Sequence, residues 1–206
     1  MSFFVLMYRE TQPEHLEEVL SQIRERLGTA PAVQGGRRSS RVFQRIGEPT
    51  HLLTVAEWDD EAGFLEFSRS PSLTNTDTLA GSPASIMPLI PLIRFEHMTR
   101  RASIASCVTM TATPEHTPAL RAFLAGPAHD ETRRLPGIVS REVYRARDKP
   151  GTFLVVHSWV SLSDLDRFRT TSALQMDRIH DHHQTTITAF TGALAAEFPP
   201  FAPASS

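Results

Sequence analysis

The sequence contains an internal duplication, since a shift of 101 residues superposes its first half on its second without a gap. Pro13-Glu14-His15 falls on Pro114-Glu115-His116, and the 61 positions from 13 to 73 hold 12 identities, where unrelated sequences would share roughly 3 to 4. The other identical pairs are Gly36 with Gly137, Ser39 with Ser140, Val42 with Val143, Pro49 with Pro150, Leu53 with Leu154, Val55 with Val156, Trp58 with Trp159, Phe67 with Phe168 and Leu73 with Leu174. The duplication predicts two related domains, over residues 1–100 and 101–198, and a disordered tail over 199–206.

The composition narrows the classes of partner and the compartment. A net charge of −2 disfavours nucleic acid and anionic membranes, because both bind basic surfaces. The single cysteine, Cys107, excludes an intrachain disulfide, and its repeat mate is Leu6, so we expect it to be a small buried hydrophobe. No stretch approaches the ~18 apolar residues of a membrane span, and the apolar run from Phe3 to Tyr8 is too short for a signal peptide. We therefore expect a cytoplasmic protein.

The apolar pattern predicts the same order of elements in each half. A helix led by Pro13 or Pro114 follows the first strand, and a second helix beginning near Asp60 or Ser161 follows the third. The predicted strands cover residues 3–8, 38–46, 52–58 and 89–98, then 104–110, 139–147, 153–159 and a weaker segment near 185–198, for which helix stays open.

This order is β-α-β-β-α-β, the ferredoxin-like arrangement. A four-stranded antiparallel sheet with helices on one face keeps a second apolar face that must be buried. We therefore predict an α+β chain in which two such sheets face each other as a pseudo-dimeric barrel. The Pro-rich segment around Pro83, Pro88 and Pro91, running to Arg100-Arg101, is predicted to be the crossover between the halves.

The architecture and spacing resemble the antibiotic-biosynthesis monooxygenase (ABM) family of dimeric α/β-barrel proteins. The resemblance lies in the strands that end at Trp58 and Trp159, each followed nine residues later by Phe67 or Phe168, and in the Pro-led first helices. It covers both halves and implies a family dimer fused into one polypeptide. It also implies a small aromatic substrate and O₂ as partners, and leaves open a homodimer of the fused chain.

Strand alternation sorts the third strands into two faces. Leu53 and Val55 are identical in both copies, which we interpret as the face that packs on the helices. The alternate residues, including Thr54 and Trp58 in the first copy and His157 in the second, differ in size and polarity. We expect that second face to line the barrel interior and to form an asymmetric pocket.

Three residues are the candidate catalytic groups: His157, Trp159 and Trp58. His157 could act as a general base on an anthrone-like substrate, giving an anion that reacts with O₂. A neutral core histidine is the alternative for His157, and packing anchors are the alternative for the two Trp residues. The predicted substrate-binding residues are Tyr144, Thr54, Phe43, Tyr8, Arg94 and Arg41, each of which could also be structural.

The resemblance bears on these candidates as well. Monooxygenases similar to this chain place an Asn four residues before the strand-end Trp, where this chain has Thr54 and Val155. Haem-degrading relatives pair a Trp and a His in and after the second helix, whereas the aligned residues here are Glu66 and Arg167, so we expect no haem.

We expect no metal and no organic cofactor. The run His180-Asp181-His182-His183 could present two imidazoles on one helix face, but its repeat mate is Leu79-Ala80-Gly81-Ser82, and an exposed polar helix is the favoured interpretation. Phosphate-binding loops, nucleophile elbows and dinucleotide fingerprints do not occur in the sequence.

The resemblance to the ABM family implies a cofactor-independent monooxygenase that oxidises an aromatic, polyketide-like substrate with O₂ to a quinone or hydroxylated product. Two alternatives stay open. One is a polyketide cyclase or isomerase, which needs the same pocket but no oxygen. The other is a non-catalytic small-molecule-binding or stress-response barrel.

Overall fold

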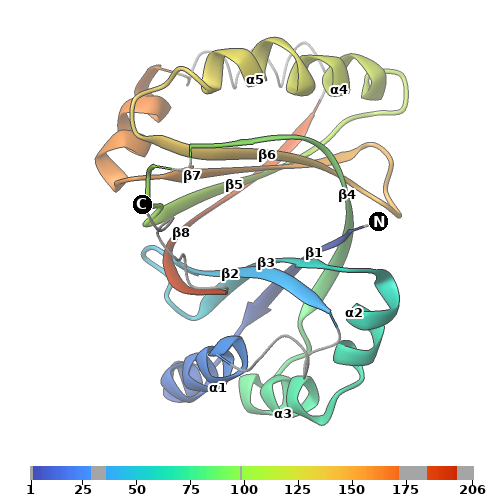
Figure 1. The fold of residues 1–206 in the computed structure, drawn as a ribbon, viewed down its shortest axis with the longest axis vertical. Helices are drawn as coiled ribbons and strands as arrows, with labels where there is room; N and C mark the ends of the chain where they lie inside the picture. The colour runs from blue at the N-terminus through green and yellow to red at the C-terminus, as the bar shows by residue number, and fades with distance from the viewer. Residues whose placement is uncertain (1, 29–35, 98, 172–184, 199–206) are drawn as a thin grey trace. The chain divides into compact units, whose positions relative to one another are not determined.

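The structure, a computed structural model, describes residues 2–28, 36–97, 99–171 and 185–198. The predicted order of elements is present in both halves (Figure 1). The first half contains β1 Phe3–Glu10, the short 3₁₀ helix η1 Pro13–His15, α1 Leu16–Gly28, β2 Arg37–Arg45, β3 His51–Trp58, α2 Glu61–Ser68, α3 Pro71–Ala80 and β4 Ser85–Glu96. The second contains β5 Ile104–Thr111, α4 Thr117–Ala125, α5 Pro127–Thr132, β6 Ile138–Ala146, β7 Thr152–Trp159, a helix over residues 162–171 and β8 Thr186–Phe198.

The eight strands form a closed antiparallel barrel, in which the hydrogen-bonded order is β1-β3-β2-β8-β5-β7-β6-β4. The chain divides into two compact units. Unit 1 extends to Pro88 and also includes the segment from Ala193, and unit 2 extends from Leu89 to Gly192. Strands β4 and β8 therefore each contribute residues to both units. The predicted α+β barrel of two ferredoxin-like repeats is confirmed.

The residue pairing between strands is the same in the two units. In unit 1, Thr54 of β3 lies opposite Met7 and Val42, and in unit 2 its mate Val155 lies opposite Val108 and Val143. The same register shift follows the first residue of β2 and of β6. One offset therefore relates the two units residue by residue, which allows their sites to be compared position for position.

The prediction about the faces of β3 and β7 was wrong. Ala56 and Trp58 pack on Phe64 of α2, and Leu52 packs on α1 and α3. In unit 2, Phe153 and Val155 pack on Leu120 and Leu124 of α4. The face that varies between the copies is thus the face under the helices, because the two units fill that space differently.

The structure adds detail to two local predictions. The Pro-rich segment predicted to be the crossover contains strand β4, which includes Pro88 and Pro91 and passes from unit 1 into unit 2 after Pro88, and a register shift follows Pro91 in the ladder with β6. A proline has no N–H for the ladder, so a strand accommodates it where the pairing is irregular. Helix α4 begins at Thr117 with Pro118 in its first turn, while Pro114 lies in the turn before it.

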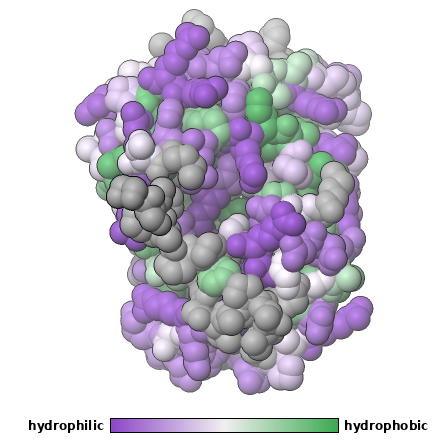
Figure 2. Space-filling model, viewed as in Figure 1, coloured by the Kyte–Doolittle hydropathy of each residue, from purple (hydrophilic) through white to green (hydrophobic). Residues whose placement is uncertain are grey.

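The described residues include no helix that is both long enough and apolar enough to cross a bilayer. The face of the molecule in Figure 2 is mostly hydrophilic, with scattered hydrophobic side chains. The large apolar residues are gathered instead between the helices and the sheets, as the buried cluster around Trp58 illustrates.

Candidate functional site

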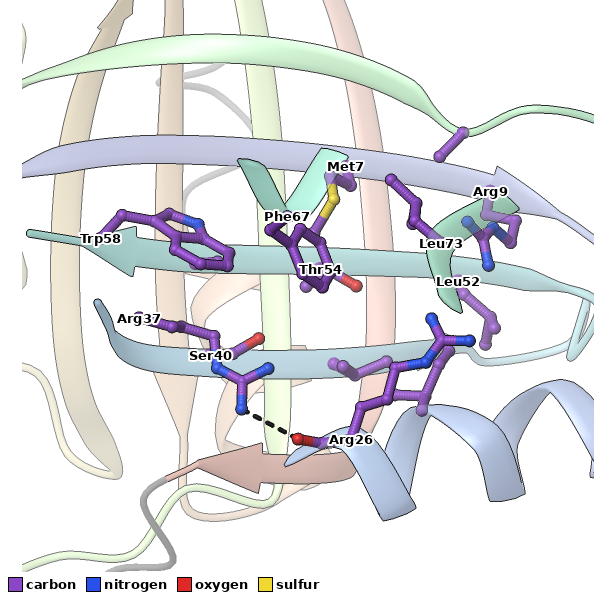
Figure 3. A pocket seen from close by; sticks show the side chains of 14 residues that line it. Met7, Arg9, Arg26, Arg37, Ser40, Leu52, Thr54, Trp58, Phe67 and Leu73 are labelled. Atoms are coloured by element: carbon purple, nitrogen blue, oxygen red, sulfur yellow. Dashed lines mark hydrogen bonds between the residues drawn. The ribbon is translucent and has the colours of Figure 1, made fainter. Parts of the chain in front are cut away.

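Unit 1 contains a cavity between the helix-facing side of its sheet and helices α1, α2 and α3 (Figure 3). Its volume is about 60 Å³, by a measure in which one water fills about 10–15 Å³, so it has room for about four to six waters. The apolar and aromatic lining consists of Met7, Ile23, Val42, Leu52, Ala56, Trp58, Phe67, Leu73 and Ala84, and the polar lining of Arg9, Arg26, Arg37, Ser40 and Thr54.

Trp58 and Phe67 form the aromatic wall of this cavity. Their rings lie 5.0 Å apart and tilted by 39°, and Phe64 meets Trp58 edge-on at 5.9 Å. Helix α2, which carries both phenylalanines, begins at Glu61 and is capped by Asp60, whose side chain accepts a hydrogen bond of 2.9 Å from the Gly63 N–H. The nine-residue spacing from Trp58 to Phe67 thus brings a second phenylalanine of α2, one turn after Phe64, against the indole.

Three arginines reach the same cavity. Arg9 pairs with Asp77 of α3, and Arg26 donates to Thr76 and, at 3.3 Å, to Gln22. Burial lowers the pKa of Arg9, partly offset by Asp77, and burial is also the largest cause of the lowered pKa of Arg26. All of these guanidinium groups stay protonated near neutral pH, so an apolar cavity carries cationic walls.

Arg37 is the most deeply buried of the three, with 4% of its surface exposed. It donates to the Arg26 carbonyl oxygen at 3.1 Å and stacks over the Phe198 ring, 4.6 Å from its centre. Burial lowers its pKa to about 10. Among the described residues no carboxylate pairs with Arg37, so its charge is balanced by nothing in the cavity wall.

The equivalent space in unit 2 is occupied by larger side chains. His157 replaces Ala56, Arg141 replaces Ser40 and Phe153 replaces Leu52, and all three are buried. Arg141 donates to the Leu124 carbonyl at 2.9 Å and lies 3.2 Å from His129 Nδ1. Trp159 and Phe168 repeat the tilted pair at 5.1 Å, with the His157 ring 6.0 Å from Trp159.

His157 is held in its neutral form. Burial, and to a lesser extent the Arg141 charge, lowers its pKa to about 3, and within the described ranges its Nε2 has no hydrogen-bond partner. A base of such low pKa gains little by taking a proton at neutral pH. The catalytic role of His157 stays a prediction, and the environment is that of a core histidine.

The family profile for antibiotic biosynthesis monooxygenases matches residues 2–76 and 103–188. The chain belongs to the antibiotic biosynthesis monooxygenase family. The matched segments are its two repeats, so this member of the family carries the family domain twice. No curated protein sequence matches the chain.

Solved structures share the fold at low identity. A Fusobacterium nucleatum protein proposed to be a monooxygenase has 9% identity and a TM-score of 0.76, over 95% of this chain and 93% of its own. An anthrone oxidase-like protein has 13% identity and a TM-score of 0.72, over 95% and 92%. A major regulator of staphylococcal pathogenesis has 16% identity and a TM-score of 0.58, over 94% and 98%. These likenesses show the fold alone.

In this ABM protein the cavity brings together only two of the predicted site residues, Thr54 and Trp58. Tyr8, Arg41 and Phe43 are on the same sheet, but their ladder partners Leu53 and Val55 place them on the side away from the helices. Tyr8 bonds there to His51 Nδ1.

The remaining predicted residues belong to unit 2. Tyr144 lies opposite Leu154, on the side of the sheet away from α4, and donates to Glu142. Arg94 is an exposed residue of β4 whose ladder partner is Glu142. His157 and Trp159 lie under the helices of unit 2. Their roles and that of Tyr144 in substrate binding stay predictions.

The three arginines and Ser40 were missed by the sequence analysis. Arg9 and Arg37 stand at helix-facing strand positions whose mates in the other repeat are Met110 and Ile138. The pairing of a charged residue in one repeat with an apolar residue in the other could have revealed Arg9 and Arg37. It did not, because the sequence analysis assigned the helix-facing side of the sheet to the wrong residues.

The structure brings no three His, Cys, Asp or Glu residues together as a metal site within the ranges it describes. The run from His180 to His183 lies outside those ranges, as does the tail over 199–206.

Proposed function

We propose that the unit 1 cavity is the active site of a cofactor-independent monooxygenase that oxidises an aromatic, polyketide-like substrate with O₂ to a quinone or hydroxylated product. The observation that carries the proposal is the combination of an aromatic wall with buried cations in one small apolar cavity. Membership of the ABM family supports the reaction class. The anthrone oxidase-like structural relative supports the fold on which such chemistry can be built.

The cations supply what oxygen activation needs from the protein. An electron-rich phenolate or enolate reduces O₂ far more readily than the neutral ring, and guanidinium groups in an apolar cavity lower the pKa of a bound phenol. For an anthrone, the ring CH₂ becomes a C=O: one oxygen atom of O₂ joins the carbon, and the other leaves as water with the two hydrogens. Substrate electrons balance this step, so no external reductant is required.

Individual residues have distinct roles in this proposal. Trp58 and Phe67 stack against the ring, and the Thr54 hydroxyl, at the position where related monooxygenases place Asn, donates to a substrate oxygen. Arg9 and Arg26 stabilise the anion. A role for His157 as the catalytic base has less support, because burial keeps the pKa of His157 near 3.

The proposal extends to the setting of the protein. We place it in the cytoplasm, consistent with a single buried cysteine, and cell fractionation tests that placement. A homodimer of the fused chain remains part of the proposal, and sedimentation equilibrium distinguishes it from a monomer.

Oxygen consumption by the purified, metal-stripped protein tests the reaction. The panel runs from naphthols through anthrones to polyhydroxylated naphthacenes, with no cofactor added. We expect protein-dependent uptake of one O₂ per quinone formed, and a kcat about tenfold lower for Thr54→Val, the value of one hydrogen bond to the anion. The Thr54→Val variant should keep the wild-type melting temperature.

Two results would contradict the proposal. Conversion of a bound substrate to an isomer without oxygen uptake would identify a cyclase or isomerase. Binding without any conversion would identify a small-molecule-binding module, a role that the shared fold permits, since a regulator also adopts it.

A further inference from the structure

Three buried nitrogen donors on the wall of the unit 1 cavity have no hydrogen-bond acceptor in the part of the chain that the structure describes. They are Nε of Arg9, Nε of Arg37 and Nε1 of Trp58. Native proteins rarely leave buried donors unpaired, since each loses its bonds to water on folding. All three unpaired atoms are donors, so a group that satisfies them must present acceptors.

The second unit shows that these donors are not a general property of the fold. There the indole N–H of Trp159 donates to Ser106 Oγ at 3.3 Å. The position equivalent to Ser106 in unit 1 is Val5, which cannot accept, and so the Trp58 N–H stays unpaired. The mates of Arg9 and Arg37 are apolar. At these three positions the unpaired donors therefore belong to unit 1, whereas among the described residues of unit 2 a different cation, Arg141 at the mate of Ser40, has an unpaired Nε.

The arrangement of the donors divides the cavity into two ends. Arg37 and Trp58 are direct ladder partners on β2 and β3, and Figure 3 shows them at one side of the cavity, with the Arg9 and Arg26 guanidinium groups at the other. Arg9 is charge-paired by Asp77, whereas Arg37 is 4% exposed and has no carboxylate partner among the described residues. The end formed by Arg37 and Trp58 is therefore a cationic donor pair without an anion.

We propose that this end of the cavity binds the carboxylate of an aromatic acid. A carboxylate has two oxygens, and two separate N–H donors, one of them on a cation, satisfy both with charge-assisted hydrogen bonds. The aromatic ring then extends along Trp58 and Phe67 toward Arg9 and Arg26. The inference names the substrate class of the active site proposed above and rests on that proposal for its location, but it concerns binding and not the reaction.

Calorimetric titration of the full chain at neutral pH and low salt tests the proposal. The probes are 1-naphthoate and its neutral isostere 1-naphthamide, neither of which has an anthrone-type carbon to oxidise. We expect the carboxylate to bind at least tenfold more tightly than the amide. Arg37→Met should remove this preference, and Trp58→Phe, which keeps an aromatic ring but loses the N–H, should reduce it. Arg38→Gln, at an exposed arginine one position along the same strand, should preserve it.

The results that would overturn the proposal are equal binding of the two probes, an Arg37→Met variant that still prefers the carboxylate, or no binding of either probe at millimolar concentration. If Arg37→Met does not fold, Arg37→Gln and Trp58→Phe give the same comparison. The oxygenase proposal fails separately: naphthoate binding without oxygen uptake on any substrate removes the reaction and leaves the anion site. Oxygen uptake on neutral anthrones together with equal binding of 1-naphthoate and 1-naphthamide keeps the reaction and removes the anion site.

Discussion

His157 and Ala56 occupy the same position of the two repeats, and the difference between them shows how one residue decides what a unit can bind. Alanine leaves space above Thr54 and beside Trp58 for a ligand. In unit 2, His157 fills the equivalent space with its own ring, whose centre lies 5.7 Å from that of the Phe168 ring. The result is a buried imidazole whose Nε2 has no hydrogen-bond partner among the residues that the structure describes.

The burial of His157 predicts that the stability of the fold depends on pH. The folded pKa of His157, about 3, lies below the value near 6.5 of an unfolded histidine. As the pH falls below 6.5, the unfolded chain therefore takes up a proton that the folded chain refuses until about pH 3, and the free energy of unfolding decreases over that window. We expect His157→Leu to make this decrease shallower, as measured by urea unfolding at pH 7, 6, 5 and 4.

The matched control is His116→Gln, a change at a histidine that is not buried. Parallel pH profiles for wild type and His157→Leu would show that His157 titrates normally, and would return it to the list of candidate bases.

At the scale of elements, Gly36 and Gly137 hold the repeated turn that leads into β2 and β6. Both have positive φ, at 77° and 75°, and the carbonyl of each accepts from the residue after the strand-end Trp, at 2.8 and 2.9 Å. A Cβ at Gly36 would meet Asp59 Oδ2 at 2.7 Å, whereas a Cβ at Gly47, φ 86°, would meet nothing within 4 Å.

The contrast between the two glycines separates backbone strain from crowding. Gly47→Ala should cost about 1–2 kcal/mol of unfolding free energy, from the left-handed backbone alone. Gly36→Ala should cost more, because Asp59 must move as well, and it should also weaken ligand binding, because Arg37 is the next residue. Chemical denaturation and naphthoate titration measure the two effects. Equal losses of stability in both variants would mean that the Asp59 contact relaxes freely.

The same elements show how far the sequence could be read. Strand ends at Trp58 and Trp159 and the helix start at Asp60 follow from local patterns, and the structure confirms them. The facing of β3 does not follow locally, because both of its faces are apolar, and identity between repeats was a poor guide to which one meets a helix. Arg37 escaped notice for a related reason: its burial depends on Phe198, which is remote in sequence.

At the scale of the whole molecule, duplication has produced two units with the same ladders and different cavities. In unit 1 the space under the helices is open and lined by three arginines. In unit 2 the equivalent space contains Arg141, Phe153 and His157, of which Arg141 is bonded to the unit's own Leu124 carbonyl. Gene fusion removes the need for two identical sites, since each half can change its own residues.

This asymmetry predicts one ligand per chain. Titration of the wild-type protein with 1-naphthoate should give a stoichiometry of one. Ala56→His, which copies the unit 2 residue into unit 1, should abolish binding while keeping the fold, because the same position already accommodates a histidine in the other repeat. Ala62→His, at an exposed site of α2, is the matched control and should bind normally. A stoichiometry of two, or binding that survives Ala56→His, would place a working site in unit 2 and restore His157 and Trp159 to it. Loss of binding in Ala56→His, with normal binding by Ala62→His, would locate the naphthoate site in unit 1.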